Sequence, residues 1–417
     1  MPTSLSNLGL TDPGKPFAPF RYPAFRAIWT ANLTSNLGSM IQSVGAAWLM
    51  TELTTSHQLV ALVQASVTIP VMLLGVFAGA IADNYDRRKV MLAAQVLMLI
   101  ASGLLAAMTW AGSIGPVSLL MFTLAVGAGT ALNGPAWQAS VRLQVGPGDL
   151  SQAISINTIA FNLARSVGPA LGGLLISLTS PALAFALNAL SFVALIAVLL
   201  RWHPEMPPRE RHPMFTSIKA GLRFCATSNP VRRVLTRGLV FGFCAAGAQA
   251  LLPLVVREQL RGTEVDYGLV LGAFGLGSIV TALWVAPARR RWGSETVVGV
   301  ATVVFALAMA PVALAQHFGL CVTLACVFIA GGGWVATLTS LNVAMQLRSP
   351  EAILGRCLSI YQAVTFGGMA LGAYASGLAS DISGLSPAIG GASVLMLMTL
   401  PVMRWLAPMP APGEGRV

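Results

Sequence analysis

The sequence predicts an all-α membrane protein with twelve transmembrane helices in two six-helix halves. Three observations indicate this fold class. Hydrophobic residues make up 55% of the 417 residues and charged residues only 9%, whereas a soluble protein carries about 25% charged residues because its surface faces water. Apolar runs of about 20 residues, long enough to cross a bilayer as a helix, recur along the chain. The strict alternation typical of membrane β-strands is absent, so helices are the expected spanning elements.

The expected spans lie on both sides of a polar middle segment. In the first half they fall at 27–51, 58–82, 89–110, 117–138, 151–178 and 182–200, and in the second half at 234–256, 266–288, 296–315, 318–345, 352–380 and 384–406. The N-terminal residues lack a charged region followed by an apolar core, so no cleaved signal peptide is expected.

Lysine and arginine indicate the orientation, because cytoplasmic loops carry an excess of both. With the N-terminus inside, all but three of the 25 basic residues fall on the cytoplasmic side, the exceptions being Arg257, Arg261 and Arg165. This asymmetry also accounts for the net charge of +11 without a nucleic-acid partner. The predicted organisation is a cytoplasmic N-terminal segment (1–26), a six-helix half (27–200), a cytoplasmic linker (201–233), a second half (234–406) and a cytoplasmic tail (407–417).

The linker contains a candidate amphipathic helix. Phe215, Ile218 and Leu222 share one helical face, while Lys219 and Arg223 face away. This pattern is typical of a helix on the inner membrane surface, and a simple solvated linker is the alternative. The five cysteines include no CxxC pair, so we interpret them as small apolar packing residues.

The loop between the second and third spans carries the most specific motif. The segment GAIADNYDRRK, Gly79 to Lys89, resembles the loop signature of the major facilitator superfamily, GxxxDRxGRR, at Gly79, Asp83, Arg87 and Arg88. Asn84 replaces the usual basic residue and Asp86 replaces the glycine. Two further segments, 25–49 and 133–173, resemble a subgroup that includes enterobactin-type siderophore exporters and macrolide efflux proteins. The resemblance covers nearly the whole chain and implies the major facilitator fold.

Gly79, Asp83, Arg87 and Arg88 are the conformational latch that this resemblance implies. In the superfamily the loop aspartate is held to latch the two halves on the inside. The implied receiver of Asp83 is the start of helix eleven, near residues 350–354, where a carboxylate gains about 0.3–1 kcal/mol from the helix N-terminus, or more if it is partly buried. An acid that only orients the span is the alternative, and Lys89 is interpreted as a cytoplasmic anchor.

Gly168, Pro169, Gly172 and Gly173 resemble the antiporter motif of helix five, GxxxGPxxGG, with Ala164 in place of its first glycine. Small residues four apart let helices touch, and proline bends a helix. We therefore expect an interface between the halves here, although packing alone would need the same residues. The two halves also match weakly when shifted by 204 residues, as expected for parallel repeats with a central substrate site.

Arg165 lies near the middle of a predicted span. A central arginine costs at least about 2.5–3.5 kcal/mol, so it should face a cavity or a partner. Two readings stay open: Arg165 attracts an anionic substrate group, or it holds backbone carbonyls and Asn162 or Asn157 where the halves meet. The candidate substrate pathway consists of polar residues inside the spans, namely Arg165, Asn162, Asn36, Gln42, Asn133, Gln138 and Gln362.

The function implied by the resemblance is secondary transport across the inner membrane. We expect an alternating-access exporter of a small amphiphilic molecule (siderophore, antibiotic or other metabolite) driven by the proton gradient, and an importer or facilitator is the alternative. An enzyme or channel has less support, because no nucleophile–base pair, metal-ligand cluster or phosphate-binding loop is found. No Asp or Glu lies well inside a span, so no proton carrier is identified. The expected partners are substrate, lipid and protons, with no cofactor or metal, and the chain is expected to be a monomer.

Overall fold

The computed structural model describes residues 15, 17–204, 214–350 and 353–409, and within them the chain is helical with no strand. The first half consists of α1 (Pro23–Leu53), α2 (His57–Asn84), α3 (Arg87–Trp110), α4 (Pro116–Ser140), α5 (Leu150–Leu178) and α6 (Pro181–Arg201). After α7 (Met214–Thr227), the second half consists of α8 (Asn229–Ala250), the short α9 (Leu252–Leu254) and η5 (Val255–Gln259), α10 (Glu264–Val312), α11 (Ala315–Gln346), α12 (Leu354–Ser383) and α13 (Leu385–Leu406).

Helix α10 is two spans joined without a loop. Its 49 residues would extend for about 74 Å as a continuous helix, more than twice the thickness of a hydrocarbon core of about 30 Å. Gly293 breaks it with φ 79° and ψ 160°, a conformation that glycine adopts readily because it has no Cβ. Counting α10 as two spans, six spans precede α7 and six follow it.

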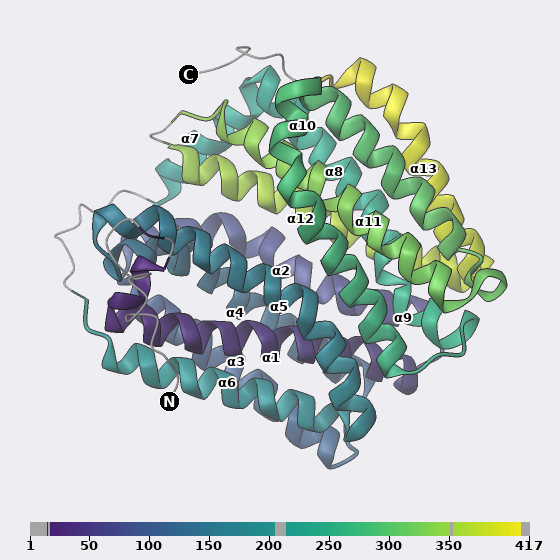
Figure 1. Ribbon diagram of the computed structural model, residues 1–417, viewed down its shortest axis with the longest axis horizontal. Coiled ribbons are helices and arrows are strands. Elements are labelled where there is room, and N and C mark those ends of the chain that lie inside the picture. The colour runs from purple at the N-terminus through teal and green to yellow at the C-terminus, as the bar shows by residue number, and fades with distance from the viewer. Residues whose placement is uncertain (1–14, 16, 205–213, 351–352, 410–417) are drawn as a thin grey trace.

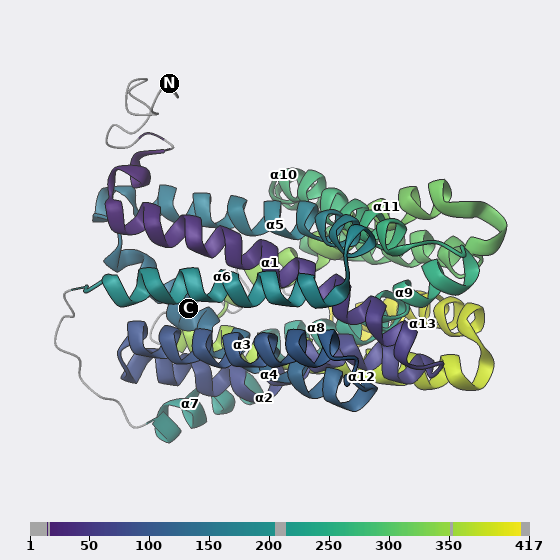
Figure 2. The same ribbon diagram turned by 90° about the horizontal axis from the view of Figure 1, so that it is seen from below.

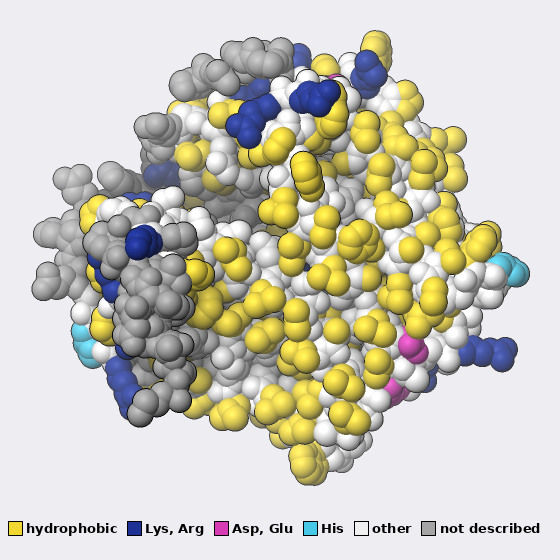
Figure 3. Space-filling model, in the orientation of Figure 1, with side chains coloured by type: hydrophobic (Ala, Val, Ile, Leu, Met, Phe, Trp, Pro, Cys, Tyr) yellow, Lys and Arg dark blue, Asp and Glu magenta, His cyan; other side chains and the backbone are white. Residues whose placement is uncertain are grey.

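Nine helices in the described part of the chain are long and apolar enough to cross a membrane. Helices α1 and α12 are equally long but more polar, and α10 supplies two spans, which gives the twelve that the sequence predicts. Figure 3 shows hydrophobic side chains over the middle of one face, with most visible lysine and arginine side chains toward the rim. The predicted fold class is therefore confirmed: this is a multi-pass helical membrane protein.

The two halves lie side by side with their helices running along the same general direction (Figures 1 and 2). In the first half α1 packs on α5 and α6, and α3 packs on α4 and α6. In the second half α8 packs on α12 and α13, and α10 packs on α11. The halves meet mainly along two helix pairs, α2 with α12 and α5 with α10.

One end of the bundle is rich in arginine, and we call it the basic end. It is the end where α1 begins, α2 ends and α7 lies. Arg88 joins α3 to the end of α6 through hydrogen bonds to the carbonyls of Leu199 and Leu200, both at 2.7 Å. In the second half the buried Arg237 donates to Glu295 Oε1 at 2.7 Å. These arginines tie helix ends together within each half. We call the other end of the bundle, where α1 ends and α2 begins, the opposite end.

A helix forms in the linker where the sequence predicts one, and it packs against α12 and α2. Its buried residues include Ile218 and Cys225, while Lys219 and Arg223 are exposed. Leu222 is half exposed, and the side chain of Phe215 lies outside the described residues, as do residues 205–213. A hydrogen bond with Cys357, and then burial, raise the pKa of the Cys225 thiol, so Cys225 stays protonated and unreactive.

Candidate functional site

The glycines of the helix-five motif face two different helices, α1 and α10. A Cβ on Gly168 would lie 2.6 Å from Met40 Cβ, and one on Gly172 would lie 3.1 Å from Ile41 Cα, so both glycines face α1 of the same half. Gly173 faces α10 instead, where a Cβ would overlap the carbonyl oxygen of Glu264. The motif therefore builds the first half and also brings α5 against the second.

The contact between α5 and α10 is a close approach of two backbones. A Cβ on Gly268 would lie 2.6 Å from the carbonyl oxygen of Pro169, and one on Gly275 would lie 2.7 Å from Ser166 Cα. Helices approach this closely only where small residues line both sides. The sequence analysis did not single out Gly268 or Gly275, the partners of the motif.

A small cavity of about 80 Å³ lies between the halves. Its lining comes from α1, α2 and α4 on one side and from α8, Pro253 and α10 on the other. Several of its lining residues carry a polar side chain: Ser43, Gln64, Thr123, Gln249 and Tyr267. A larger cavity of about 540 Å³ lies among α8, α10, α11 and α13, and no described residue of the first half lines it. Carriers of this architecture place the substrate between the repeats, so the interface is the candidate site despite its smaller volume.

Arg165 lies on α5 outside the lining of the small cavity, where α5 meets α10, and it faces aromatic side chains of the second half. Its guanidinium carbon is 6.0 Å from the centroid of the Phe274 ring on α10, within range of a cation–π interaction. Phe274 meets Trp334 of α11 edge-to-face, with ring centroids 5.8 Å apart. Phe241 and Phe305 also pack on Trp334. A positive charge therefore stands beside a buried aromatic cluster contributed by the other half.

The predicted tie between Arg165 and Asn162 is not formed. The Asn162 amide donates to the carbonyl of Thr158 in its own helix at 2.9 Å. The Asn157 amide is buried, and neither its oxygen nor its nitrogen has a partner among the described residues. Within the same residues the Arg165 side chain has no hydrogen-bond partner and is half-buried. Its donors are thus available to a molecule that enters between the halves.

The other predicted pathway residues differ in their surroundings. Gln42 is buried and accepts a hydrogen bond from Asn188 of α6 at 2.8 Å, which ties helices within the first half. Asn36 and Asn133 are half-buried, and the Asn133 Oδ1 atom has no partner in the described part of the chain. Gln138 and Gln362 are exposed. Asn36 and Asn133 therefore remain candidates, while Gln42 has a structural partner.

Residues of the loop motif form hydrogen bonds at the ends of helices. Asp86 caps α3, where its carboxylate accepts from the backbone N–H groups of Arg88 and Lys89. Arg87 donates to the carbonyl of Ala139 at the end of α4 at 2.8 Å, within the first half. Gly79 faces α12, since a Cβ there would lie 3.1 Å from Ser359 Oγ. The side chain of Asp83 and residues 351–352 lie outside the described residues, so the predicted latch stays a prediction.

At the opposite end a hydrogen-bonded cluster joins the halves, and the sequence analysis missed it. Asp381, near the end of α12, accepts from the backbone N–H groups of His57 at 2.6 Å and Gln58 at 3.2 Å. It also accepts from the Ser56 hydroxyl at 3.0 Å. The carboxylate thus caps the first turn of α2, a position that negative charge favours. Within the described residues, no group of three or more His, Cys, Asp or Glu side chains is placed to hold a metal ion.

Comparison with known proteins gives concordant results. The model of a family described as transmembrane secretion effector matches residues 14–412. The enterobactin exporter EntS of Citrobacter koseri is 27% identical, with 94% of this chain and 95% of that protein covered. The staphyloferrin A transporter of Staphylococcus aureus is 22% identical, with coverages of 84% and 87%.

Solved structures resemble the whole fold. The nucleoside transporter NupG superposes with a TM-score of 0.74 at 13% identity, covering 92% of this chain and 99% of that one. A bacterial homologue of the iron transporter ferroportin gives a TM-score of 0.70 at 16% identity, with coverages of 92% and 98%. At such identities these structures show a shared fold and nothing about the substrate.

Proposed function

Because the chain belongs to the transmembrane secretion effector family of the major facilitator superfamily, and is therefore a membrane transporter, we propose that it exports small amphiphilic molecules by alternating access. Curated relatives of nearly full-length similarity are described as exporters of enterobactin or as a transporter of staphyloferrin A. We propose a substrate of the same broad kind, a siderophore or another secreted metabolite, with the proton gradient as the driving force.

The observation that carries this proposal is the pairing of Arg165 with the aromatic cluster at the interface. Arg165 offers donors to an anionic group, while Phe274 and Trp334 offer apolar and aromatic surface on the facing half. An amphiphilic anion satisfies both sides at once. A binding site shared by two halves also changes shape when the halves move, as alternating access requires.

The packing of α5 against α10 supports a state that is open toward the basic end. The close approaches at Ser166, Pro169 and Gly173 fall in the part of α5 nearer the opposite end. Among the described glycines, no close approach between α5 and α10 lies nearer the basic end than Arg165. In our proposal the basic end is cytoplasmic, the termini lie in the cytoplasm, and the substrate enters there.

Transport in everted inner-membrane vesicles tests the proposal, because export from a cell becomes uptake into such vesicles. We expect uptake of enterobactin, staphyloferrin A or a related metabolite when the vesicle interior is acidified, with loss of uptake when a protonophore is added. Uptake only into right-side-out vesicles would identify an importer. No protein-dependent flux of any tested metabolite in either orientation would contradict the proposal.

The orientation has a direct test with introduced cysteines. Cys225 is unsuitable as a reporter because it is buried and protonated. We expect Thr55→Cys, in the exposed turn between α1 and α2, to react with a membrane-impermeant maleimide in intact cells. His203→Cys, exposed at the end of α6, should react only after the membrane is made permeable. The background carries Cys321→Ser and Cys326→Ser, and the reverse labelling pattern would invert the proposed orientation.

The latch prediction for Asp83 is tested by Asp83→Asn, which keeps the size of the side chain and removes its charge. We expect normal amounts of protein in the membrane and at least about a tenfold loss of transport, the effect of about 1.4 kcal/mol. Asp86→Asn is the matched control, because asparagine also caps helices well, so this variant should transport normally. Equal transport by the two variants would show that Asp83 is no latch.

A further inference from the structure

The hydrogen bonds of His57 connect three helical elements at the opposite end. Its Nδ1 atom lies 2.7 Å from the hydroxyl of Ser380 on α12, and its Nε2 atom lies 3.1 Å from Glu258 Oε1 on η5. The backbone N–H of the same residue donates to Asp381. His57 begins α2 of the first half, whereas all three partners belong to the second half. These contacts can therefore exist only while the halves are together at this end.

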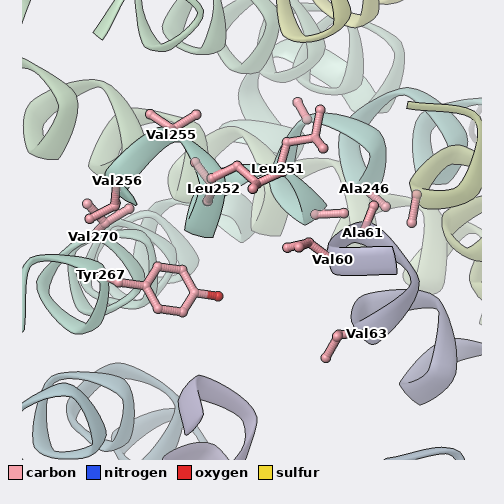
Figure 4. Close-up of a cluster of buried hydrophobic side chains, with 14 of the residues drawn as sticks. Val60, Ala61, Val63, Ala246, Leu251, Leu252, Val255, Val256, Tyr267 and Val270 are labelled. Atoms are coloured by element: carbon pink, nitrogen blue, oxygen red, sulfur yellow. The ribbon is translucent and has the colours of Figure 1, made fainter. Parts of the chain in front are cut away.

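The cluster lies at the end of the bundle where the two halves must separate to release a substrate outside. One turn further along α2, Val60 and Ala61 join a buried apolar cluster with Leu251, Leu252 and Val255 of the second half (Figure 4). A Cβ on Gly377 of α12 would lie 2.8 Å from both Ala61 Cβ and Gln58 Cα. The polar cluster therefore lies on the outer side of a buried apolar contact between the halves. His57 is 17% exposed and Glu258 is 44% exposed, so protons can reach the imidazole from solution.

Four charged groups lie on the elements that meet at His57. The titratable groups on the elements that meet here are Glu52 at the end of α1, Asp381 on α12, and Arg257 and Glu258 on η5. Glu258 and Asp381 both contact His57, directly or through its backbone. Arg257 is directed elsewhere, since its guanidinium donates to Thr51 at 2.7 Å and lies over the Trp48 ring. Glu52 accepts from the Trp48 indole.

We propose that His57, together with Glu258 and Asp381, is a proton-binding site that closes the opposite end of the transporter. A neutral imidazole satisfies both ring contacts only when Ser380 donates to Nδ1, and it carries no charge. A protonated imidazole donates through both nitrogens and adds charge attraction to two carboxylates. Opening separates His57 from these partners. The closed state therefore binds the proton more tightly than the open state does, and by linkage protons favour closure.

Through this site the acidity of the exterior would act on the transport cycle, because His57 exchanges its proton with the solution at the opposite end. After a substrate leaves at the opposite end, a proton from the more acidic exterior would bind His57 and favour the return to the state open at the basic end. Histidine suits this task because its charge changes between about pH 5 and 8. The direction of the effect in a cell rests on the function and orientation proposed above, whereas the link between His57 protonation and closure does not.

Double electron–electron resonance on the purified full-length protein measures closure without any substrate. Spin labels on Thr55→Cys in the first half and Gln316→Cys in the second report the distance across the opposite end, with Cys321 and Cys326 replaced by serine. We expect the ratio of closed to open protein to rise by about two- to fivefold from pH 8 to pH 5.5, the range for an ion pair that stays partly in water. The matched control His203→Gln removes an exposed histidine from the basic end and should leave this rise unchanged.

His57→Gln should abolish the pH response, and Glu258→Gln should weaken it, because Asp381 still attracts the protonated ring. His57→Arg should hold the end closed at both pH values, because its charge does not titrate in this range. A wild-type ratio that does not change with pH, or a response that survives His57→Gln, would overturn the inference. Should His57→Gln fail to fold, Glu258→Gln decides instead: a weaker pH response supports the inference, and an unchanged response overturns it. A His57-dependent response in a protein that transports no metabolite would uphold the proton site and refute only the proposed function.

Discussion

Arg165→Gln is expected to raise the apparent Michaelis constant for an anionic substrate by about 10- to 150-fold while the yield of folded protein stays near that of the wild type. The magnitude follows from the loss of a charged hydrogen bond, about 1.5–3 kcal/mol. The yield should survive because Arg165 has no hydrogen-bond partner among the described residues whose loss would destabilise the fold. Initial rates of vesicle uptake over a range of substrate concentrations measure the constant, and detergent-stable yield measures folding.

Two further variants separate attraction of charge from other effects of this substitution. Arg165→Lys keeps the charge but loses the planar set of donors and much of the stacking on Phe274, so we expect an intermediate Michaelis constant. Arg142→Gln removes an exposed arginine from the basic end and controls for the change in net charge. A collapse in yield for both Arg165→Gln and Arg165→Lys would instead assign Arg165 a structural role. Wild-type behaviour of both would remove it from the site.

Gly173→Val is expected to slow the transport cycle strongly by disfavouring closure of the opposite end. The added side chain would overlap the carbonyl of Glu264, and this backbone cannot move aside as a flexible side chain could. Overpacking of this kind costs about 1–3 kcal/mol, which corresponds to a shift of about 5- to 150-fold toward the open state. Spin labels at positions 55 and 316 should report the longer distance at every pH, and transport should fall in proportion.

Gly103→Val is the matched control. Gly103 also lies within a transmembrane helix, α3, but a Cβ there meets no atom within 4 Å. Both variants carry the same small cost of replacing glycine by valine in a helix, so any difference between them comes from the contact with α10. If Gly173→Val closes and transports as well as Gly103→Val does, the approach of α5 to α10 is not part of the cycle.

The sequence predicted the fold class because lipid imposes a simple rule on helix length and composition. It did not predict how the helix-five motif is divided, although the signal was present. Residues four apart share a helical face, so Gly168 and Gly172 had to point one way and Pro169 and Gly173 another. The sequence could not show which helix packs on each face, because contacts between helices leave no pattern in the local sequence.

The candidate site was harder to predict for the same reason. Arg165 stood out because a charge inside a span is expensive, but Phe274 and Trp334 look like ordinary apolar residues until the structure places them beside it. The cluster at the opposite end joins His57 to Asp381, which lie 324 positions apart in the sequence. Each residue alone reads as a polar group at the end of a span. These residues form a cluster only because the two halves pack together in the folded protein.

The glycine break in α10 has a mechanical consequence. The chain reverses direction between the two spans of α10 at Gly293. No loop separates the span that lies against α5 from the one that leads on to α11. When the first span moves to release α5, the start of the second span moves with it, and α11, which packs on α10, is displaced as well. Movement at the contact with α5 is therefore passed along the second half without an intervening loop.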